Sequence, residues 1–201
     1  MAYISGAVEG PSDEAVLRRL VAHRGASVHR VQVQNGKPNL RRALTGYNDA
    51  AQGDPWLVLV DLDQEFDCAS ALVTDWLPHP NHYMRFRVVV RQVESWLLAD
   101  GDRFSQFFSV RRSAIPALPD NLPDSKAALL SLVATSTRRA IREDMTPRPR
   151  SGRRVGPAYT SRLIEFVTRE TEGWRPEIAA ASSPSLASCM ERLTQLVAIA
   201  P

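Results

Sequence analysis

The distribution of hydrophobic residues predicts that strands and helices alternate along the first half of the chain. Four short segments are either apolar throughout or alternate between apolar and polar positions, as strands do: residues 2–9, 28–33, 56–62 and 85–91. A helix is expected after each of them: from Ser12, over 39–51, over 68–77 and from Glu94. Such alternation implies right-handed crossovers and a mostly parallel four-stranded sheet, an α/β fold with helices on both faces.

The second half of the chain predicts helices and no further strand. Helices are expected over residues 125–134, 159–167 and 185–197. Between the first two, residues 138–156 are rich in Arg and Pro and lack an apolar stripe, so we expect a mobile loop there. We therefore divide the chain into an α/β core, residues 1–110, and a helical C-terminal extension, residues 111–201.

Composition places the chain among ordinary globular proteins. Hydrophobic residues make up 44% of the 201 positions and charged residues 23%, and the net charge of +3 is too small for a strongly basic binder. The sequence has no apolar run long enough to span a membrane and no basic-then-apolar start typical of a secretory signal. We expect a cytoplasmic protein without a membrane partner.

Acidic residues gather where the predicted strands end. Glu9 ends the first strand, Asp61 and Asp63 end the third, Glu94 follows the fourth, and Asp13 begins the first helix. The carboxyl ends of parallel strands meet at one edge of the sheet, where open α/β folds bind ligands. In an extended strand, two residues separated by one position point to the same face. Neighbouring carboxylates repel unless a cation or a proton lies between them, and Mg²⁺ prefers oxygen ligands, so the pattern predicts a magnesium (or manganese) site.

Each of these residues also has a simpler interpretation. Asp13 and Glu94 could be the acids that the helix dipole favours in a first turn. Asp61 and Asp63 could be solvated acids that end a strand. Lys126 could be a solvated lysine, although the start of a helix is an unfavourable place for a positive charge.

The acidic positions carry a resemblance to a known domain. Val8–Asp13, followed by Asp61–Asp63, resembles the TOPRIM domain of topoisomerases, bacterial primases and the overcoming-lysogenization-defect (OLD) nucleases. The resemblance covers residues 1 to about 100. It implies a Rossmann-like sheet and magnesium-dependent chemistry on nucleic acid.

A narrower resemblance extends over most of the chain. Glu94–Asp100, Lys126, Trp174–Glu177 and Pro184–Leu186 are similar to a small TOPRIM-like family. The genes of that family often lie beside a gene for an AAA or ABC-type ATPase, in arrangements suggestive of phage defence. The resemblance therefore implies an ATPase partner.

The two resemblances imply a role for each acidic residue. Glu9 becomes a metal ligand or general acid/base, and Asp61 and Asp63 become the pair that binds magnesium. Asp13 and Glu94 match further acids of these motifs. Lys126 matches a lysine that could contact the scissile phosphate, where a fixed positive charge stabilises the transition state.

A run of arginines is the best candidate for contact with nucleic acid. Its members are Arg138, Arg139, Arg142, Arg148, Arg150, Arg153 and Arg154. Arginine suits bidentate phosphate contacts, and such contacts are independent of base sequence. A solvated loop without a partner is the alternative interpretation.

Taken together, the sequence favours a magnesium-dependent nuclease for DNA or RNA, the effector subunit of an ATPase-coupled defence system. Two alternatives stay open, as does the oligomeric state. One is a phosphatase of the haloacid-dehalogenase type with Asp61 as covalent nucleophile, although Glu65 stands where that motif has a threonine. The other is a non-catalytic sensor or scaffold within a defence complex.

Overall fold

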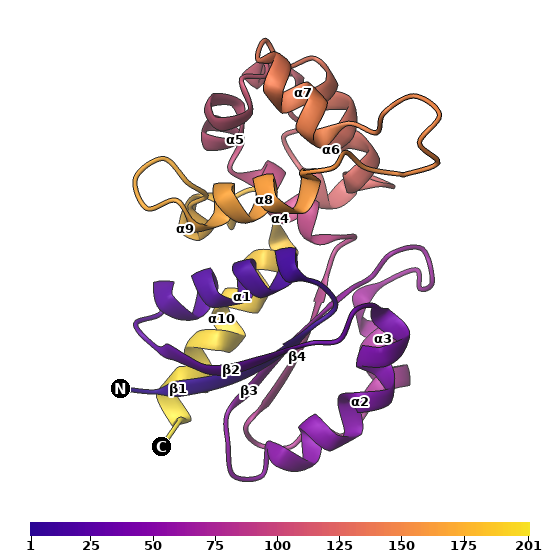
Figure 1. Cartoon of the computed structure of the whole chain (residues 1–201). Helices are drawn as coiled ribbons and strands as arrows, with labels where there is room; N and C mark the ends of the chain where they lie inside the picture. Colours follow the sequence, from indigo (N-terminus) through magenta and orange to yellow (C-terminus); the bar gives the residue numbers. More distant parts are fainter.

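Four parallel strands form one sheet in the order β2-β1-β3-β4 (Figure 1). The computed structural model describes residues 1–201. The strands are β1 Tyr3–Val8, β2 Ser27–Val33, β3 Trp56–Asp61 and β4 Met84–Val89. β1 and β3 lie side by side at the centre, with Ala7 opposite Val58. The predicted α/β class is therefore confirmed.

Helices cover both faces of the sheet (Figure 1). α1 (Pro11–His23) and α10 (Pro184–Ile199) lie on one face, and α2 (Lys37–Ala50) and α3 (Ala69–Trp76) lie on the other. Along β3, Leu57 and Leu59 pack in the hydrophobic cluster on the α1 and α10 face of the sheet. Val58 and Val60 pack in a second cluster on the α2 and α3 face. Because alternate strand residues point to opposite faces, a strand buried on both faces needs an uninterrupted apolar run.

The remaining helices form a lobe above the carboxyl edge of the sheet (Figure 1). They are α4 Val93–Ala99, α5 Gly101–Phe108, α6 Ser125–Ala134, α7 Arg139–Met145, α8 Tyr159–Thr168 and α9 Pro176–Ala179, with two 3₁₀ turns at Arg112–Ala114 and Pro119–Asn121. None of the helices in the chain has the length and hydropathy needed to cross a membrane.

The prediction of a loop over residues 138–156 is wrong for the first half of this segment. Arg139–Met145 forms α7, which buries Ile141 and Met145 against the lobe. Two apolar residues in one short helix are too few to form a recognisable helical pattern in a sequence segment rich in arginine. The irregular segment between α7 and α8 covers residues 146–158, and we call its part over residues 146–155 the arginine loop.

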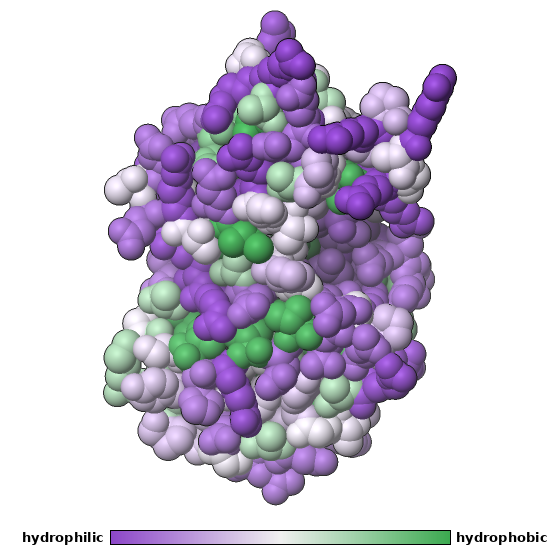
Figure 2. All heavy atoms as spheres, in the orientation of Figure 1, coloured by the Kyte–Doolittle hydropathy of each residue, from purple (hydrophilic) through white to green (hydrophobic).

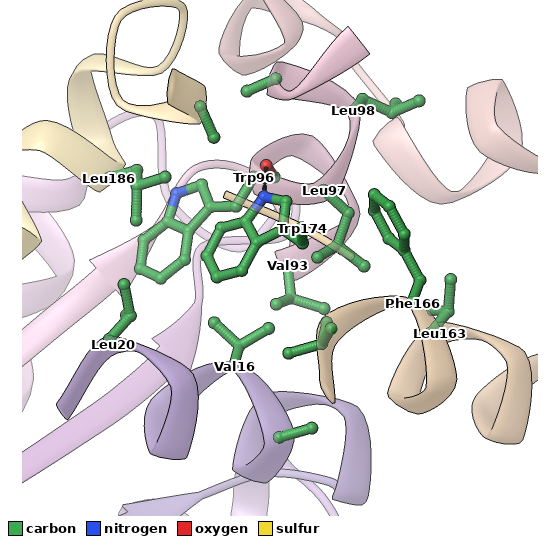
Figure 3. Packing of buried hydrophobic residues seen from close by; sticks show 14 of the residues in the cluster. Val16, Leu20, Val93, Trp96, Leu97, Leu98, Leu163, Phe166, Trp174 and Leu186 are labelled. Atoms are coloured by element: carbon green, nitrogen blue, oxygen red, sulfur yellow. Dashed lines mark hydrogen bonds between the residues drawn. The ribbon is translucent and has the colours of Figure 1, made fainter. Parts of the chain in front are cut away.

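One hydrophobic core continues across the expected boundary at residue 110. Figure 3 shows Val16 of α1 beneath the indoles of Trp174 and Trp96 of α4, with Phe166 of α8 farther along the same core. Trp174 Nε1 donates a hydrogen bond to the backbone oxygen of Trp96 at 2.9 Å. The helical extension therefore completes the core of the sheet, because α1 lies between the sheet and α8.

We predict that Trp174→Ala destabilises the sheet and the lobe together. Trp174 is fully buried, so its removal leaves a large cavity and should lower the free energy of unfolding by about 3–5 kcal/mol. Urea unfolding followed by far-UV circular dichroism should show one shifted transition. Leu118→Ala, at a side chain that is 53% exposed, should change the free energy by less than about 0.5 kcal/mol. A sheet that survives after the lobe has unfolded would contradict the shared core.

Candidate functional site

The central strands bring Glu9 and Asp61 into contact. Glu9 follows β1 and Asp61 ends β3, and these two strands pair in parallel. Glu9 Oε1 accepts a hydrogen bond from the backbone N–H of Asp61 at 2.9 Å. The prediction that acids from separate strand ends meet at the carboxyl edge is therefore confirmed for this pair.

The carboxylate of Asp61 links the end of β3 to the start of α4. Asp61 Oδ1 accepts a hydrogen bond from the backbone N–H of Val93 at 3.1 Å. Val93 is the first residue of α4, and Glu94 is the second. This contact fixes the Asp61 side chain and sets Glu94 beside it.

Asp13 is fixed by the turn that begins α1. The backbone N–H of Gly10 donates to Asp13 Oδ2 at 2.9 Å. Gly10 is the N-cap residue, so the helix begins at Pro11, one residue before the expected start at Ser12. A Cβ on residue 10 would lie 3.2 Å from Asp13 Oδ2, a tight contact that would require the Asp13 side chain to shift slightly.

Glu94 is almost completely buried, and the helical lobe supplies its partners. Glu94 Oε1 accepts a hydrogen bond from the hydroxyl of Tyr159 at 2.8 Å and lies 3.4 Å from Lys126 Nζ. The other carboxylate oxygen, Oε2, is buried and has no hydrogen-bond partner. Buried polar atoms normally have a partner, so an orphan oxygen at this place is a candidate ligand atom.

We call Glu9, Asp13, Asp61 and Glu94, together with Lys126, the acidic site. Burial raises the pKa of Glu9 to about 7, and the charge of Asp63 adds to the shift. Burial, followed by the charges of Glu94 and Glu9, raises the pKa of Asp13 to about 7. Burial, with the charges of Asp13 and Glu94, also raises the pKa of Asp61. The site therefore holds more negative charge than its surroundings compensate.

Lys126 is the positive charge within the acidic site. Burial would lower its pKa, but the negative charges of Glu94, Asp61 and Asp13 outweigh burial and raise the pKa. Lys126 is therefore protonated at neutral pH and is paired with Glu94 rather than fully solvated.

The side chains of Asp61 and Asp63 do not point to the same face, as they would if the strand stayed extended as far as Asp63. β3 ends at Asp61, and Asp63 has a left-handed backbone with φ +53°. Asp63 Oδ2 lies 3.1 Å from Lys37 Nζ, and Oδ1 accepts a hydrogen bond from Gln92 Nε2 at 3.1 Å. Lys37 Nζ also lies 3.2 Å from Glu65. The chain turns after Asp61, and Lys37 draws the second aspartate into a separate ion-pair cluster.

Three residues of this region were not assigned from the sequence. Tyr159 lies 65 positions from Glu94, and no spacing rule connects the two. Lys37 directly follows Asn35-Gly36, a dipeptide typical of turns, and it is buried and ion-paired. Gln92 stands directly after β4, so the rule that strand ends meet at one edge could have found it.

The arginine run does not form one surface. Arg138 donates to the backbone oxygen of Phe107, Arg142 donates to that of Ser136, and Arg139 pairs with Glu143. Arg138 joins the start of α7 to α5, whereas the pair formed by Arg139 lies within α7 itself. The other members, which lie on the arginine loop, are Arg148, Arg150, Arg153 and Arg154.

The chemistry of the acidic site fits a hard divalent cation. Its donors are all carboxylate oxygens, and one of them, Glu94 Oε2, lacks a partner. The side chains as positioned do not form a group of three or more that encloses a single point. A cation would therefore have to draw the carboxylates inward, which their mutual repulsion now opposes.

We predict that Tyr159→Phe lowers the free energy of unfolding by about 1–3 kcal/mol, because a buried carboxylate oxygen loses its hydroxyl donor. Chemical denaturation measures the change. Tyr3→Phe is the matched control, since Tyr3 is 59% exposed and should tolerate the loss of its hydroxyl. Equal stability of the two variants would contradict the assigned contact with Glu94.

We also predict that the folded protein loses stability as the pH rises. Glu9 and Asp13 titrate near pH 7 in the folded chain, whereas unfolded carboxyl groups titrate at about pH 4. Between these values the folded state binds more protons, so the free energy of unfolding falls as the pH rises through this range. Melting temperatures at pH 5 and pH 8, measured with a chelator, test this. Asp61→Asn should flatten the dependence, and an unchanged slope would contradict the charge cluster.

Comparisons with known proteins leave the family of the chain open. The chain matches no protein-family model, no curated protein and no solved structure. What the chain does must therefore be inferred from the residues and geometry of the acidic site itself.

Proposed function

We propose that the chain is a magnesium- or manganese-dependent nuclease that hydrolyses phosphodiester bonds of DNA or RNA at the acidic site. The observation that carries the proposal is the meeting of four carboxylates from three chain segments at the carboxyl edge of the sheet, with one lysine among them. Ligands bind at this edge in open α/β folds.

The resemblance to the TOPRIM domain supports the same reaction. Glu9, Asp13 and Asp61 carry this resemblance, Glu94 carries the narrower one, and the four residues lie in one site. Asp63, the second acid of the DLD segment, would have to leave its ion pair with Lys37 before it could contribute. An ATPase partner and a role in phage defence are proposed on the resemblance alone.

A divalent cation held by Glu9, Asp13, Asp61 and Glu94 would stabilise the negative charge that develops on the reacting phosphate. The protein's own groups supply the other requirements. The backbone N–H of Asp61 fixes Glu9 Oε1, so the Glu9 carboxylate is positioned either to bind the cation or to accept a proton from the attacking water.

Lys126 and Tyr159 orient the deepest carboxylate. Both bind Glu94 Oε1, which fixes the direction of Oε2. Lys126 is 39% exposed, so its ammonium can also reach a phosphate oxygen of the substrate. A charge fixed in this way needs little reorganisation during the reaction.

The geometry gives less support to a phosphatase with Asp61 as nucleophile. That reaction needs a second acid two residues later beside the first one, and Asp63 is bound to Lys37 and Gln92 instead. Trapping of a phosphoaspartate at Asp61 would favour the phosphatase.

The proposal predicts that the purified chain cuts nucleic acid when Mg²⁺ or Mn²⁺ is present, either alone or with its ATPase partner. Asp61→Asn should lower the rate by about 100-fold or more, because the central carboxylate of the site is lost. The readout is the cleavage of labelled single- and double-stranded DNA and RNA, with and without chelator.

The matched control is Asp49→Asn, which removes an exposed carboxylate on α2 far from the edge. It should cut at the wild-type rate. If Asp61→Asn folds normally and cuts as fast as this control, the assignment of the acidic site is wrong. If the wild-type chain binds metal but cuts no phosphoester with its partner present, the non-catalytic sensor or scaffold is the better account.

A further inference from the structure

A cavity of about 470 Å³ opens beside the acidic site, between the sheet and the helical lobe. Figure 2 shows a hollow at this level of the molecule, below the arginine loop. The walls come from the segment after β3, the β4–α4 connection and the lobe: Asp63, Gln64, Glu65, Arg91, Gln92, Pro123, Asp124 and Arg154. Apart from Pro123, every lining residue is polar or charged.

The cavity and the acidic site share a wall. Gln92 lines the cavity, and its side chain bonds to Asp63 and to the backbone N–H of Lys126. The next residue, Val93, donates to Asp61. A ligand in the cavity would therefore lie next to the centre where the reaction is proposed to occur.

The acids in the wall already have partners. Asp63 and Glu65 both pair with Lys37, at 3.1 and 3.2 Å. Asp124 Oδ1 caps α6 by accepting a hydrogen bond from the backbone N–H of Ala127 at 2.8 Å. Their negative charges are therefore partly compensated within the protein.

The two arginines in the wall have no acidic partner. Arg91 Nη1 donates to the backbone oxygen of Asp63 at 2.8 Å, and neither Arg91 nor Arg154 forms an ion pair. Arg91 comes from the connection between β4 and α4, and Arg154 comes from the arginine loop. Guanidinium groups in this position are available to an anion, and their planar donors match phosphate.

The base of the arginine loop is fixed close to Arg154. The backbone N–H of Gly156 donates to the oxygen of Met145 at 2.8 Å, and that of Ala158 donates to Asp144 at 2.9 Å. A Cβ on residue 156 would lie 2.3 Å from the backbone oxygen of Asp144, so the close approach requires glycine. Arg154 stands two residues from this anchor, whereas Arg148 and Arg150 are farther along the loop.

We propose that Arg91 and Arg154 bind the phosphate that flanks the scissile one in a single nucleic-acid strand. The inference rests on the proposed nuclease function and assigns its substrate path. Because the walls offer no aromatic or aliphatic surface for a base, the cavity grips the sugar–phosphate backbone and binds strands of different sequence alike.

The test is binding of a fluorescently labelled single-stranded oligonucleotide, as DNA and as RNA, measured by anisotropy in the presence of chelator. Arg154→Ala should weaken binding about tenfold and lower the slope of log K against log salt by about 0.7. Arg153→Ala is the matched control, since this neighbour is also exposed but does not line the cavity; it should change binding less than twofold. Asp61→Asn should bind at least as well as the wild type.

The outcomes separate this inference from the proposed function. Equal losses in Arg154→Ala and Arg153→Ala, no binding by the wild-type chain, or tenfold differences between base compositions would each overturn the phosphate site. If the chain cuts nucleic acid but Arg154→Ala leaves binding and KM unchanged, the nuclease proposal is supported and the phosphate-binding role of the cavity is rejected. If Arg154→Ala selectively weakens binding while no nucleic acid is cut, the phosphate-binding role of the cavity is supported and the nuclease proposal is rejected.

Discussion

The repulsion among buried carboxylates is the constraint on which the rest of the structure depends. Glu9, Asp13, Asp61 and Glu94 come from three segments of the chain, and each side chain is held by a hydrogen bond from a backbone N–H or from the lobe. These bonds keep like charges close together in a partly buried site, where burial already opposes ionisation. The negative charge of these carboxylates is therefore not fully compensated at the edge of the sheet where open α/β folds bind ligands.

The helical lobe belongs to this site as much as the sheet does. It contributes Tyr159 and Lys126 to Glu94 and Arg154 to the neighbouring cavity. The shared core around Trp96 and Trp174 keeps the lobe in place above the strand ends (Figure 3). Loss of that core would separate the partners of Glu94 from the carboxylates that follow β1 and β3.

The sheet can be predicted from the sequence because each strand is marked by its own local pattern of hydrophobic residues. The apolar run of β3 and the acids at the strand ends predict that Glu9 and Asp61 reach the same edge, and the pairing of β1 with β3 brings them into contact. The turn at Asp63 could not be predicted, since it depends on a left-handed residue and on a lysine that is distant in sequence. α7 was missed because its burial rests on two apolar residues, and Tyr159 because only tertiary packing connects it with Glu94.

Isothermal titration calorimetry of Mg²⁺ or Mn²⁺ binding near pH 7 tests the account most directly. The account predicts that binding releases protons, because Glu9 and Asp13 are partly protonated before the cation arrives. The measured heat should therefore depend on the ionisation enthalpy of the buffer, and Asp61→Asn should abolish binding. Absence of binding to the wild-type chain, or binding that Asp61→Asn leaves unchanged, would contradict it.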